Sequence, residues 1–438
     1  MTNSFRATRP QAKTIESLAL KKLTLDNLRT GHPIFLGEPS SIGVVRVELF
    51  WPAGTKQQST PYQASLAVDL LLSGDESHSE YDVIRYLDHL GATHSTETNL
   101  LGSSLVFRCA KKHANDVANW VFKHVHAASY PVSEFENAVM IRRGSLERQQ
   151  QTPKYWSSRI ALESLYGKSH VLGAHGNLYD YQTIERGHLV EFKKQHLALN
   201  DIMLLVSGDY DQETVKHLEG LLNEFPSSGF KISFDPNDSN PSIEGQQENN
   251  QTPLIVNHPM ENTSQTNLQM VSHVVPKDQN ERHRLTLLNL VLGGYFGSRL
   301  MQILREERGL TYGIGSYFRP SFQNYTWTIS GELNSTHIKE SIECIEEVFQ
   351  TLKQNKINDE ELYKIKQYYA GQFRSGFDGP FATNSKVQHL IYRSLPNDYY
   401  NTILPSIWAV TAEEIMETAN NYLHTTSFIT VLSGDTTA

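Results

Sequence analysis

Arg305 and Tyr312 have side chains and a spacing that could place two hydrogen-bonding groups at one point. A guanidinium presents its N–H donors in a fixed planar fork, and a phenol hydroxyl both donates and accepts. Arg305 lies in the last turn of a predicted helix, and Tyr312 lies on the predicted strand that leaves it. Because a single turn separates them, the sequence indicates that both groups can reach the same place.

A helix, a glycine stop and a strand must position this pair. Ser298 is a natural N-cap residue for the helix. Leu300, Ile303 and Leu304 follow it at helical spacing. Gly309 stands where a helix ends in a left-handed residue, and residues 310–315 alternate as a strand does. The alternative is a purely structural role: an ordinary helix–strand corner in which Arg305 only complements the helix dipole.

The same stretch resembles the signature of the second half of insulinase/pitrilysin metallopeptidases. It reads Gly-Ser-Arg-Leu from position 297, then Leu-Arg-Glu-x-x-Gly-Leu-x-Tyr-Gly from position 304. Members of that family bind zinc through an inverted His-x-x-Glu-His motif. The resemblance covers nearly the whole chain and implies that Arg305 and Tyr312 belong to the substrate-binding side of an active site.

The zinc motif that the resemblance calls for is degenerate. Active members carry it on the helix before a Gly-Thr turn, so that two imidazoles and a general-base carboxylate share one helix face. The matching turn here is Gly74-Asp75, which places Ser65, Val68 and Asp69 at the His, Glu and His positions. Serine and valine cannot replace an imidazole ligand and a general base, so we expect no peptidase zinc in this chain.

Other residues do not restore the zinc site in the sequence. The family's distal glutamate ligand should fall near residues 144–146, and only Glu147 is close. Neither His-x-x-Glu-His nor His-Glu-x-x-His occurs among the 18 histidines. Three groups of histidines are near neighbours in sequence: His78, His89 and His94; His124 and His126; His170 and His175. None has metal-binding spacing on a helix face with a placed carboxylate, so we expect surface or core histidines.

The chain repeats itself at about half its length, which indicates an internal duplication. Residues 202–209 (Ile-Met-Leu-Leu-Val-Ser-Gly-Asp) return as residues 428–435 (Phe-Ile-Thr-Val-Leu-Ser-Gly-Asp). Two further pairs have similar offsets: residues 90–93 with 308–311, and the predicted capping boxes 133–136 and 358–361. The polar, turn-rich stretch between the copies is typical of a linker. We therefore predict domains at 20–225 and 253–438, joined by a linker at 226–252.

Both halves show strands followed by helices without strict alternation, which predicts an α+β fold. The first half has predicted strands at 42–51, 93–98 and 103–109, capping residues at 60–63 and 79–82, and a long helical region at 111–150 broken at Tyr130-Pro131. The second half has predicted strands at 268–275, 312–318 and 325–332 and a helix at 278–292. The resemblance implies two homologous domains, each an antiparallel or mixed sheet packed with helices, in a fold resembling the mitochondrial processing peptidase.

Composition excludes several classes of protein. The 438 residues are 39% hydrophobic and 20% charged, with no apolar run near the length of a membrane span. The net charge of −9 is interspersed, which argues against nucleic-acid binding. Cys109 and Cys344 are too far apart in sequence to indicate a disulfide framework. Residues 1–22 lack the apolar core of a signal peptide, so we expect a cytoplasmic protein, with a mitochondrial or periplasmic location as the alternative.

The resemblance implies a non-catalytic subunit of a two-chain zinc peptidase. A partner bearing His-x-x-Glu-His would supply zinc and general base in a heterodimer, while Arg305 and Tyr312 hydrogen-bond peptide substrates; a homodimer is also open. A second hypothesis is a catalytically inert assembly core of the same fold. A third is an enzyme with relocated metal ligands.

Overall fold

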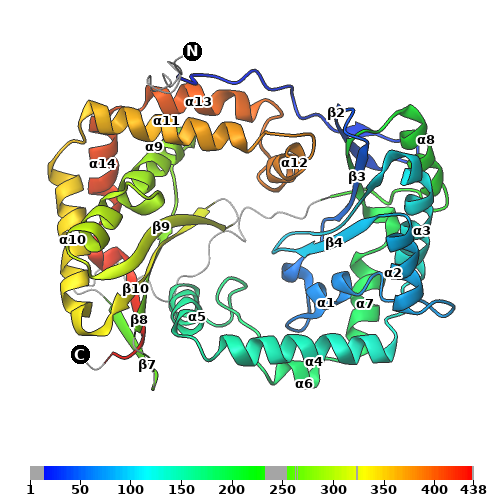
Figure 1. Ribbon diagram of the computed structural model, residues 1–438, viewed down its shortest axis with the longest axis horizontal. Helices are drawn as coiled ribbons and strands as arrows, with labels where there is room; N and C mark the ends of the chain where they lie inside the picture. The colour runs from blue at the N-terminus through cyan, green and yellow to red at the C-terminus, as the bar shows by residue number, and fades with distance from the viewer. Residues whose placement is uncertain (1–13, 232–253, 262, 264, 322–323, 437–438) are drawn as a thin grey trace, which may run out of the picture.

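Two mixed β-sheets, one from each half of the chain, face each other across the molecule (Figure 1). The computed structural model describes residues 14–231, 254–261, 263, 265–321 and 324–436. Most of the predicted linker, from residue 232 to 252, lies outside the described residues, and residues 226–231 form no helix or strand. No helix in the described ranges is long and apolar enough to cross a membrane.

The first sheet has the strand order β1-β2-β6-β3-β5-β4. Its strands are β1 (Asp26–Asn27), β2 (Pro33–Pro39), β3 (Val44–Trp51), β4 (Thr93–Thr98), β5 (Ser103–Ala110) and β6 (Met203–Gly208). Strands β2 and β6 are parallel, and the other neighbours are antiparallel.

The second sheet has the order β7-β11-β8-β10-β9. Its strands are β7 (Leu254–Pro259), β8 (Gln265–Val274), β9 (Thr311–Ser321), β10 (Asn324–Asn334) and β11 (Ile429–Gly434). Strands β7 and β11 are parallel and the rest are antiparallel. Apart from β1, the two sheets therefore share strand order and strand direction, and β6 and β11 are the segments whose sequences repeat.

Helices pack around each sheet. The first half contains α1 (Gln63–Asp69), α2 (Glu80–His89), α3 (Ala114–Ala127), α4 (Val132–Gln149), α5 (Pro153–Tyr166), α6 (Asp180–Thr183), α7 (Arg186–His196) and α8 (Gln212–Leu221). The second contains α9 (Gln279–Asn289), π-helical segments Leu290–Gly294 and Met301–Glu307, α10 (Ile338–Gln354), α11 (Asp359–Ser375), α12 (Thr383–Tyr392), α13 (Tyr399–Ala409) and α14 (Ala412–Tyr422). Short 3₁₀ helices lie at Thr55–Gln57, Lys111–His113, Leu199–Asp201, Ser335–His337 and Thr425–Ser427.

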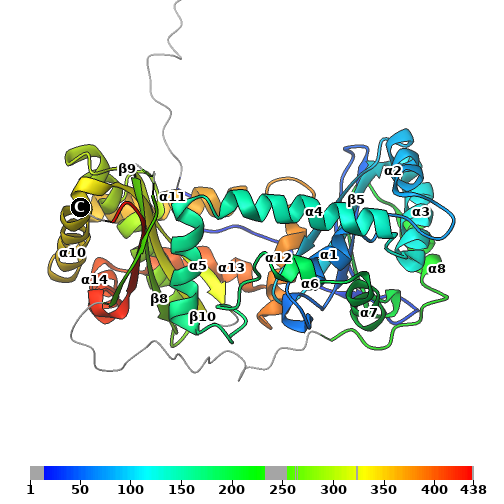
Figure 2. The same cartoon turned by 90° about the horizontal axis from the view of Figure 1, so that it is seen from below.

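Helix α5 belongs to the first half in sequence but packs on the second sheet. Helix α4 runs along one side of the molecule and delivers α5 to that sheet (Figures 1 and 2). The buried residues Leu165 and Tyr166 of α5 share an apolar cluster with Val271 and Val431. Ser157 Oγ also donates to Asn267 Oδ1 at 2.6 Å.

Helix α12 makes the reciprocal exchange, because it comes from the second half and packs on the first sheet. Helix α11 runs along the opposite side of the molecule from α4 and leads to it (Figure 1). Val387 and Leu390 share a buried cluster with Phe50 and Leu205 of the first sheet. The amide of Gln388 donates to Glu48 Oε1 at 2.6 Å. Each half therefore supplies one helix to cover the sheet of the other.

Several predictions of element boundaries are confirmed. The strand at 93–98 has the predicted bounds, and Ser79 and Asp82 form the predicted capping box of α2. The long helical region breaks at Tyr130, which has a left-handed φ of 53°. Asn358 caps α11 by accepting from the backbone N–H of Glu361.

Two predicted helix starts are wrong. Helix α1 begins at Gln63 rather than near Pro61, because Tyr62 is left-handed (φ 69°) and the Gln63 side chain accepts from the backbone N–H of Ser59 instead of closing a capping box. Helix α4 begins directly after Pro131, so the predicted box at 133–136 lies inside the helix. Tyr130 fixes this early start, since its buried hydroxyl donates to the carbonyl of Ala67.

Candidate functional site

The helix at the zinc-motif position is α1, and it contains Ser65, Val68 and Asp69. Val68 is fully buried in the core of the first half, so its side chain is not available to any ligand. Asp69 accepts hydrogen bonds from the hydroxyl of Thr96 on β4 and from the guanidinium of Arg142 on α4.

Arg142 is the residue that joins the degenerate motif positions. Its Nη1 donates to Ser65 Oγ at 2.8 Å, and its Nη2 donates to the Ser65 carbonyl at 3.4 Å and forms an ion pair with Asp69. Arg142 was not predicted from the sequence, because the family's ligand in this region is a carboxylate and an arginine is not a metal ligand. Glu147, the nearest acid to the distal-ligand position, pairs with Arg143 at 3.0 Å instead. Five residues turn a helix by about 140°, so Glu147 and Arg142 lie on different faces of α4.

These residues do not fit the family's zinc ion. Zinc requires lone pairs from imidazole, thiolate or carboxylate groups, and the two former imidazole positions hold Ser65 and Asp69. A guanidinium carries a positive charge and has no acceptor atom, so Arg142 repels a cation and already engages the one carboxylate present. The positive charge that faces Ser65 and Asp69 is the guanidinium of Arg142.

The structure brings Arg305 and Tyr312 together. The guanidinium carbon of Arg305 lies 5.8 Å from the ring centroid of Tyr312 and 5.2 Å from that of Phe296. Such distances are typical of cation–π contacts. Tyr312 is 83% exposed and Phe296 is 66% exposed, so both aromatic faces are accessible. Phe296 was not singled out from sequence, where it is one aromatic residue within a glycine-rich turn.

The helix that carries Arg305 ends at Gly309 as predicted, but Ser298 does not cap its start. Gly309 has φ 62°, and the backbone N–H of Leu310 donates to the carbonyl of Leu304 at 2.7 Å, which closes the helix end. Ser298 directly precedes the helix, but its buried hydroxyl has no hydrogen-bond partner within the described ranges, so it does not cap. The helix is π-helical over Met301–Glu307, which changes the spacing expected for an α-helix.

Two adjoining pockets lie near the zinc-motif position, and one of them is lined by Ser65 of α1. One, of about 420 Å³, is lined by Tyr62 and Ser65 among others, and the second, of about 380 Å³, by Arg159 and Arg319. His175 lines both, so they adjoin. Burial, together with the charges of Arg159 and Arg319, lowers the pKa of His175. The edge strands β4 and β9 border the space between the halves (Figure 1), and β9 carries both Tyr312 and Arg319.

Comparison with solved structures identifies the fold. The fold matches the crystal structure of a peptidase M16 inactive domain from Pseudomonas fluorescens, with a TM-score of 0.81 at 20% identity over 95% of this chain and 98% of that one. A protease from Helicobacter pylori matches with a TM-score of 0.78 at 13% identity, over 94% of this chain and 99% of that one. The fold is thus that of two-sheet M16 proteins.

The sequence comparisons agree with the fold. Residues 183–369 match the family model described as the peptidase M16 inactive domain. An uncharacterized zinc protease of Rickettsia bellii is 23% identical over 70% of this chain and 73% of its own length. The Helicobacter pylori non-peptidase homolog YmxG is 24% identical over 53% of this chain and 52% of its own length. The predicted resemblance to the insulinase/pitrilysin family is thus confirmed: residues 183–369 match the M16 inactive-domain model in sequence, and nearly the whole chain matches M16 proteins in fold.

Proposed function

We propose that this protein is the non-catalytic, substrate-binding subunit of a two-chain M16 zinc peptidase. The observation that carries the proposal is the contrast between its two candidate sites. Arg142 occupies the degenerate zinc position, whereas Arg305 and Tyr312 lie together with an exposed phenol on the edge strand β9. A chain that has lost only the metal half of the site would still bind substrate.

In this function Arg305 and Tyr312 would donate hydrogen bonds to backbone carbonyls of a peptide. They would also stabilise the oxyanion that develops when water attacks the scissile carbonyl. Zinc and the general base would come from a partner chain with an intact His-x-x-Glu-His motif. Strand β9 ends its sheet within the part of the chain that the structure describes, so its outer edge offers backbone groups to an extended peptide, which fits β-strand addition.

We also propose that the two halves arose by duplication and that the protein acts in the cytoplasm as a heterodimer. The equal strand order of the two sheets supports the duplication, as does the repeated sequence of β6 and β11. The corresponding glycines Gly91 and Gly309 also have similar left-handed φ values, 63° and 62°.

The test combines the protein with a candidate catalytic partner recovered by pull-down. Cleavage of a quenched fluorescent peptide should occur only in the mixture and should stop when a chelator is added. Arg305→Ala or Tyr312→Phe should lower kcat on the order of 100-fold or more, since each removes a donor to the transition state.

The control is Tyr317→Phe, which removes a phenol hydroxyl from the same strand and should leave kcat unchanged. Both site variants should still bind the partner in the pull-down. Full turnover by Arg305→Ala and Tyr312→Phe complexes would rule out the substrate-binding role.

The alternative function is an inert assembly core. It is favoured by the likeness to a chain of the complex III2 structure from Candida albicans, with a TM-score of 0.72 at 11% identity over 94% of this chain and 96% of that one. A stable partner complex with no cleavage under any condition, unaffected by substitution of Arg305, would support it over the peptidase subunit.

A further inference from the structure

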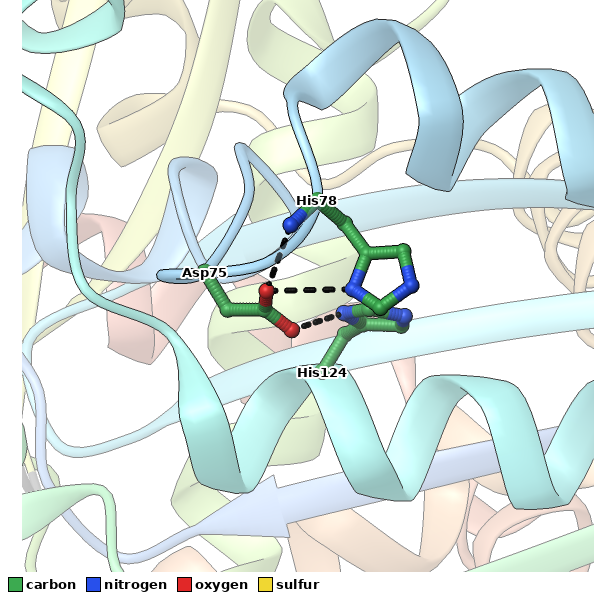
Figure 3. Close-up of side chains that lie close together, drawn as sticks. All are labelled: Asp75, His78 and His124. Carbon is green, nitrogen blue, oxygen red and sulfur yellow. Dashed lines mark hydrogen bonds and ion pairs between the residues drawn. The ribbon is translucent and has the colours of Figure 1, made fainter.

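Asp75, His78 and His124 come together on the first half although His124 is far from the other two in sequence (Figure 3). Asp75 and His78 lie in the loop between α1 and α2, and His124 lies on α3. His78 Nδ1 is 3.1 Å from Asp75 Oδ1, and His124 Nδ1 is 2.9 Å from Asp75 Oδ2. Each oxygen of the Asp75 carboxylate therefore faces the Nδ1 atom of one histidine.

The cluster is enclosed on most sides. The His124 side chain is 1% exposed, and His78 is 27% exposed. The ring of Trp120 lies 4.3 Å from His124 and 5.4 Å from His78, centroid to centroid, and forms one wall. Solvent therefore reaches the group from the side of His78.

The loop backbone holds Asp75 in place independently of the histidines. Asp75 Oδ1 accepts from the backbone N–H groups of Ser77 at 2.7 Å and His78 at 2.8 Å. Gly74 has φ 120°, and a Cβ at this position would lie 2.7 Å from the carbonyl of His78, so the loop requires glycine there. The carboxylate is thus oriented before any ligand arrives.

Two imidazoles and one carboxylate are ligands that zinc and similar divalent transition metals prefer. All three ligand atoms lie within 4.8 Å of one another. A tetrahedral zinc ion with bonds of about 2.0 Å holds its ligand atoms about 3.3 Å apart. The separations of 3.1 Å and 2.9 Å join the two Nδ1 atoms to different oxygens of Asp75, so one ion requires side-chain rotations that bring both nitrogens toward a single oxygen.

We propose that Asp75, His78 and His124 bind one divalent transition-metal ion of the zinc type. Water entering beside His78 supplies the fourth ligand. The ion ties the α1–α2 loop to α3 and so stabilises the outer layer of the first half. The site shares no residue with the degenerate zinc helix, and the proposal does not depend on the peptidase function.

Metal binding fixes the tautomer of both histidines. His78 Nδ1 lies within hydrogen-bond distance of Asp75 Oδ1, and His124 Nδ1 lies beside Asp75 Oδ2; a proton on either Nδ1 must move to Nε2 to free the Nδ1 lone pair. His78 Nε2–H can then donate a hydrogen bond to water on the exposed side. Both ring nitrogens of the buried His124 lack a hydrogen-bond partner within the described ranges, so a proton on Nε2 is no less satisfied than one on Nδ1.

The competing description is a metal-free triad in which the carboxylate simply hydrogen-bonds two imidazoles. The test uses the full-length protein purified with a chelator and then equilibrated with Co²⁺ or Zn²⁺. We expect one Co²⁺ per chain with the visible absorption of a tetrahedral site, and a higher melting temperature with Zn²⁺.

The diagnostic variant is His78→Asn, whose amide can still donate to Asp75 but is a poor zinc ligand. It should fold as the wild type does without metal and weaken metal binding on the order of 100-fold or more. The matched control His89→Asn changes an exposed histidine of α2 and should bind as the wild type does. Asp75→Asn keeps the loop's acceptor oxygen and should also weaken binding.

Two results would overturn the proposal. The first is a folded wild-type protein that retains no metal after dialysis. The second is metal binding that His78→Asn and Asp75→Asn leave unchanged, which would assign the ion to other histidines on the surface.

Discussion

Arg142 places a positive charge beside the α1 residues that the resemblance aligns with the zinc motif. Its guanidinium hydrogen-bonds Ser65 and forms an ion pair with Asp69. These contacts join α4 to α1. Because these contacts lie within the first half, a change at Arg142 should leave the Arg305–Tyr312 pair of the second half in place.

At the residue scale, we predict that Arg142→Ala lowers the free energy of unfolding by about 1 kcal/mol, the range of partly exposed ion pairs. The pair is in this range because the Arg142 and Asp69 side chains are 24% and 43% exposed. Urea unfolding measures the change, and a double-mutant cycle with Asp69→Ala isolates the interaction.

The matched control for Arg142 is Arg143→Ala. Arg143 is the next residue on α4 and pairs with Glu147 in a more exposed i,i+4 contact, which typically contributes about 0.3–0.5 kcal/mol. Equal losses for the two variants would show that Arg142 is an ordinary surface cation.

At the scale of elements, the exchange of α5 and α12 decides how the halves depend on each other. Each helix leaves its own half along a long connecting helix, α4 or α11, and buries its apolar face on the opposite sheet. The free energy of burying these faces is therefore shared between halves that the chain separates. An isolated half would expose one sheet face and one helix face.

The exchange predicts that a core substitution in α5 destabilises the second sheet. Leu165 is 1% exposed and packs with Val271 and Val431, so Leu165→Ala should lower the free energy of unfolding by about 2–5 kcal/mol. Hydrogen exchange should show faster opening of β8 and β11 than in the wild type.

Met140→Ala on α4 serves as the control, because Met140 is 65% exposed and its truncation should change stability by less than about 0.5 kcal/mol. Unchanged protection of β8 and β11 in Leu165→Ala would mean that α5 does not stabilise the second sheet.

At the scale of the whole molecule, burial of neutral histidines makes stability depend on pH. Burial, reinforced by neighbouring Arg282, lowers the pKa of His283 on α9 from 6.5 to about 4. Burial, with Arg393, Lys386 and Arg282 nearby, does the same for His389 on α12. The unfolded chain binds these protons first, so their contribution to stability is complete above about pH 6.5 and is lost as the pH falls toward 4.

We therefore predict that the free energy of unfolding falls between pH 6.5 and 4 with a slope of up to about 1.4 kcal/mol per pH unit for each of these histidines. Urea unfolding at a series of pH values measures the slope. His283→Gln should reduce this slope by the contribution of one histidine. An unchanged slope in that variant would contradict the assignment.

The sequence by itself determined the family signature, most strand positions and the loss of the zinc motif. These features are local: alternation, capping residues such as Ser79, a glycine at 309 and the residue types at 65, 68 and 69 are all encoded in short stretches. The helix starts at α1 and α4 were mispredicted because buried long-range contacts, such as Tyr130 with Ala67, overrode local capping signals.

Only the tertiary structure decided the contacts between distant segments. The ion pair of Arg142 with Asp69 and the meeting of His78 with His124 join residues on different elements, and no spacing along the chain encodes them. The exchange of α5 and α12 was likewise invisible, because an amphipathic helix specifies that it buries an apolar face but not which sheet receives it.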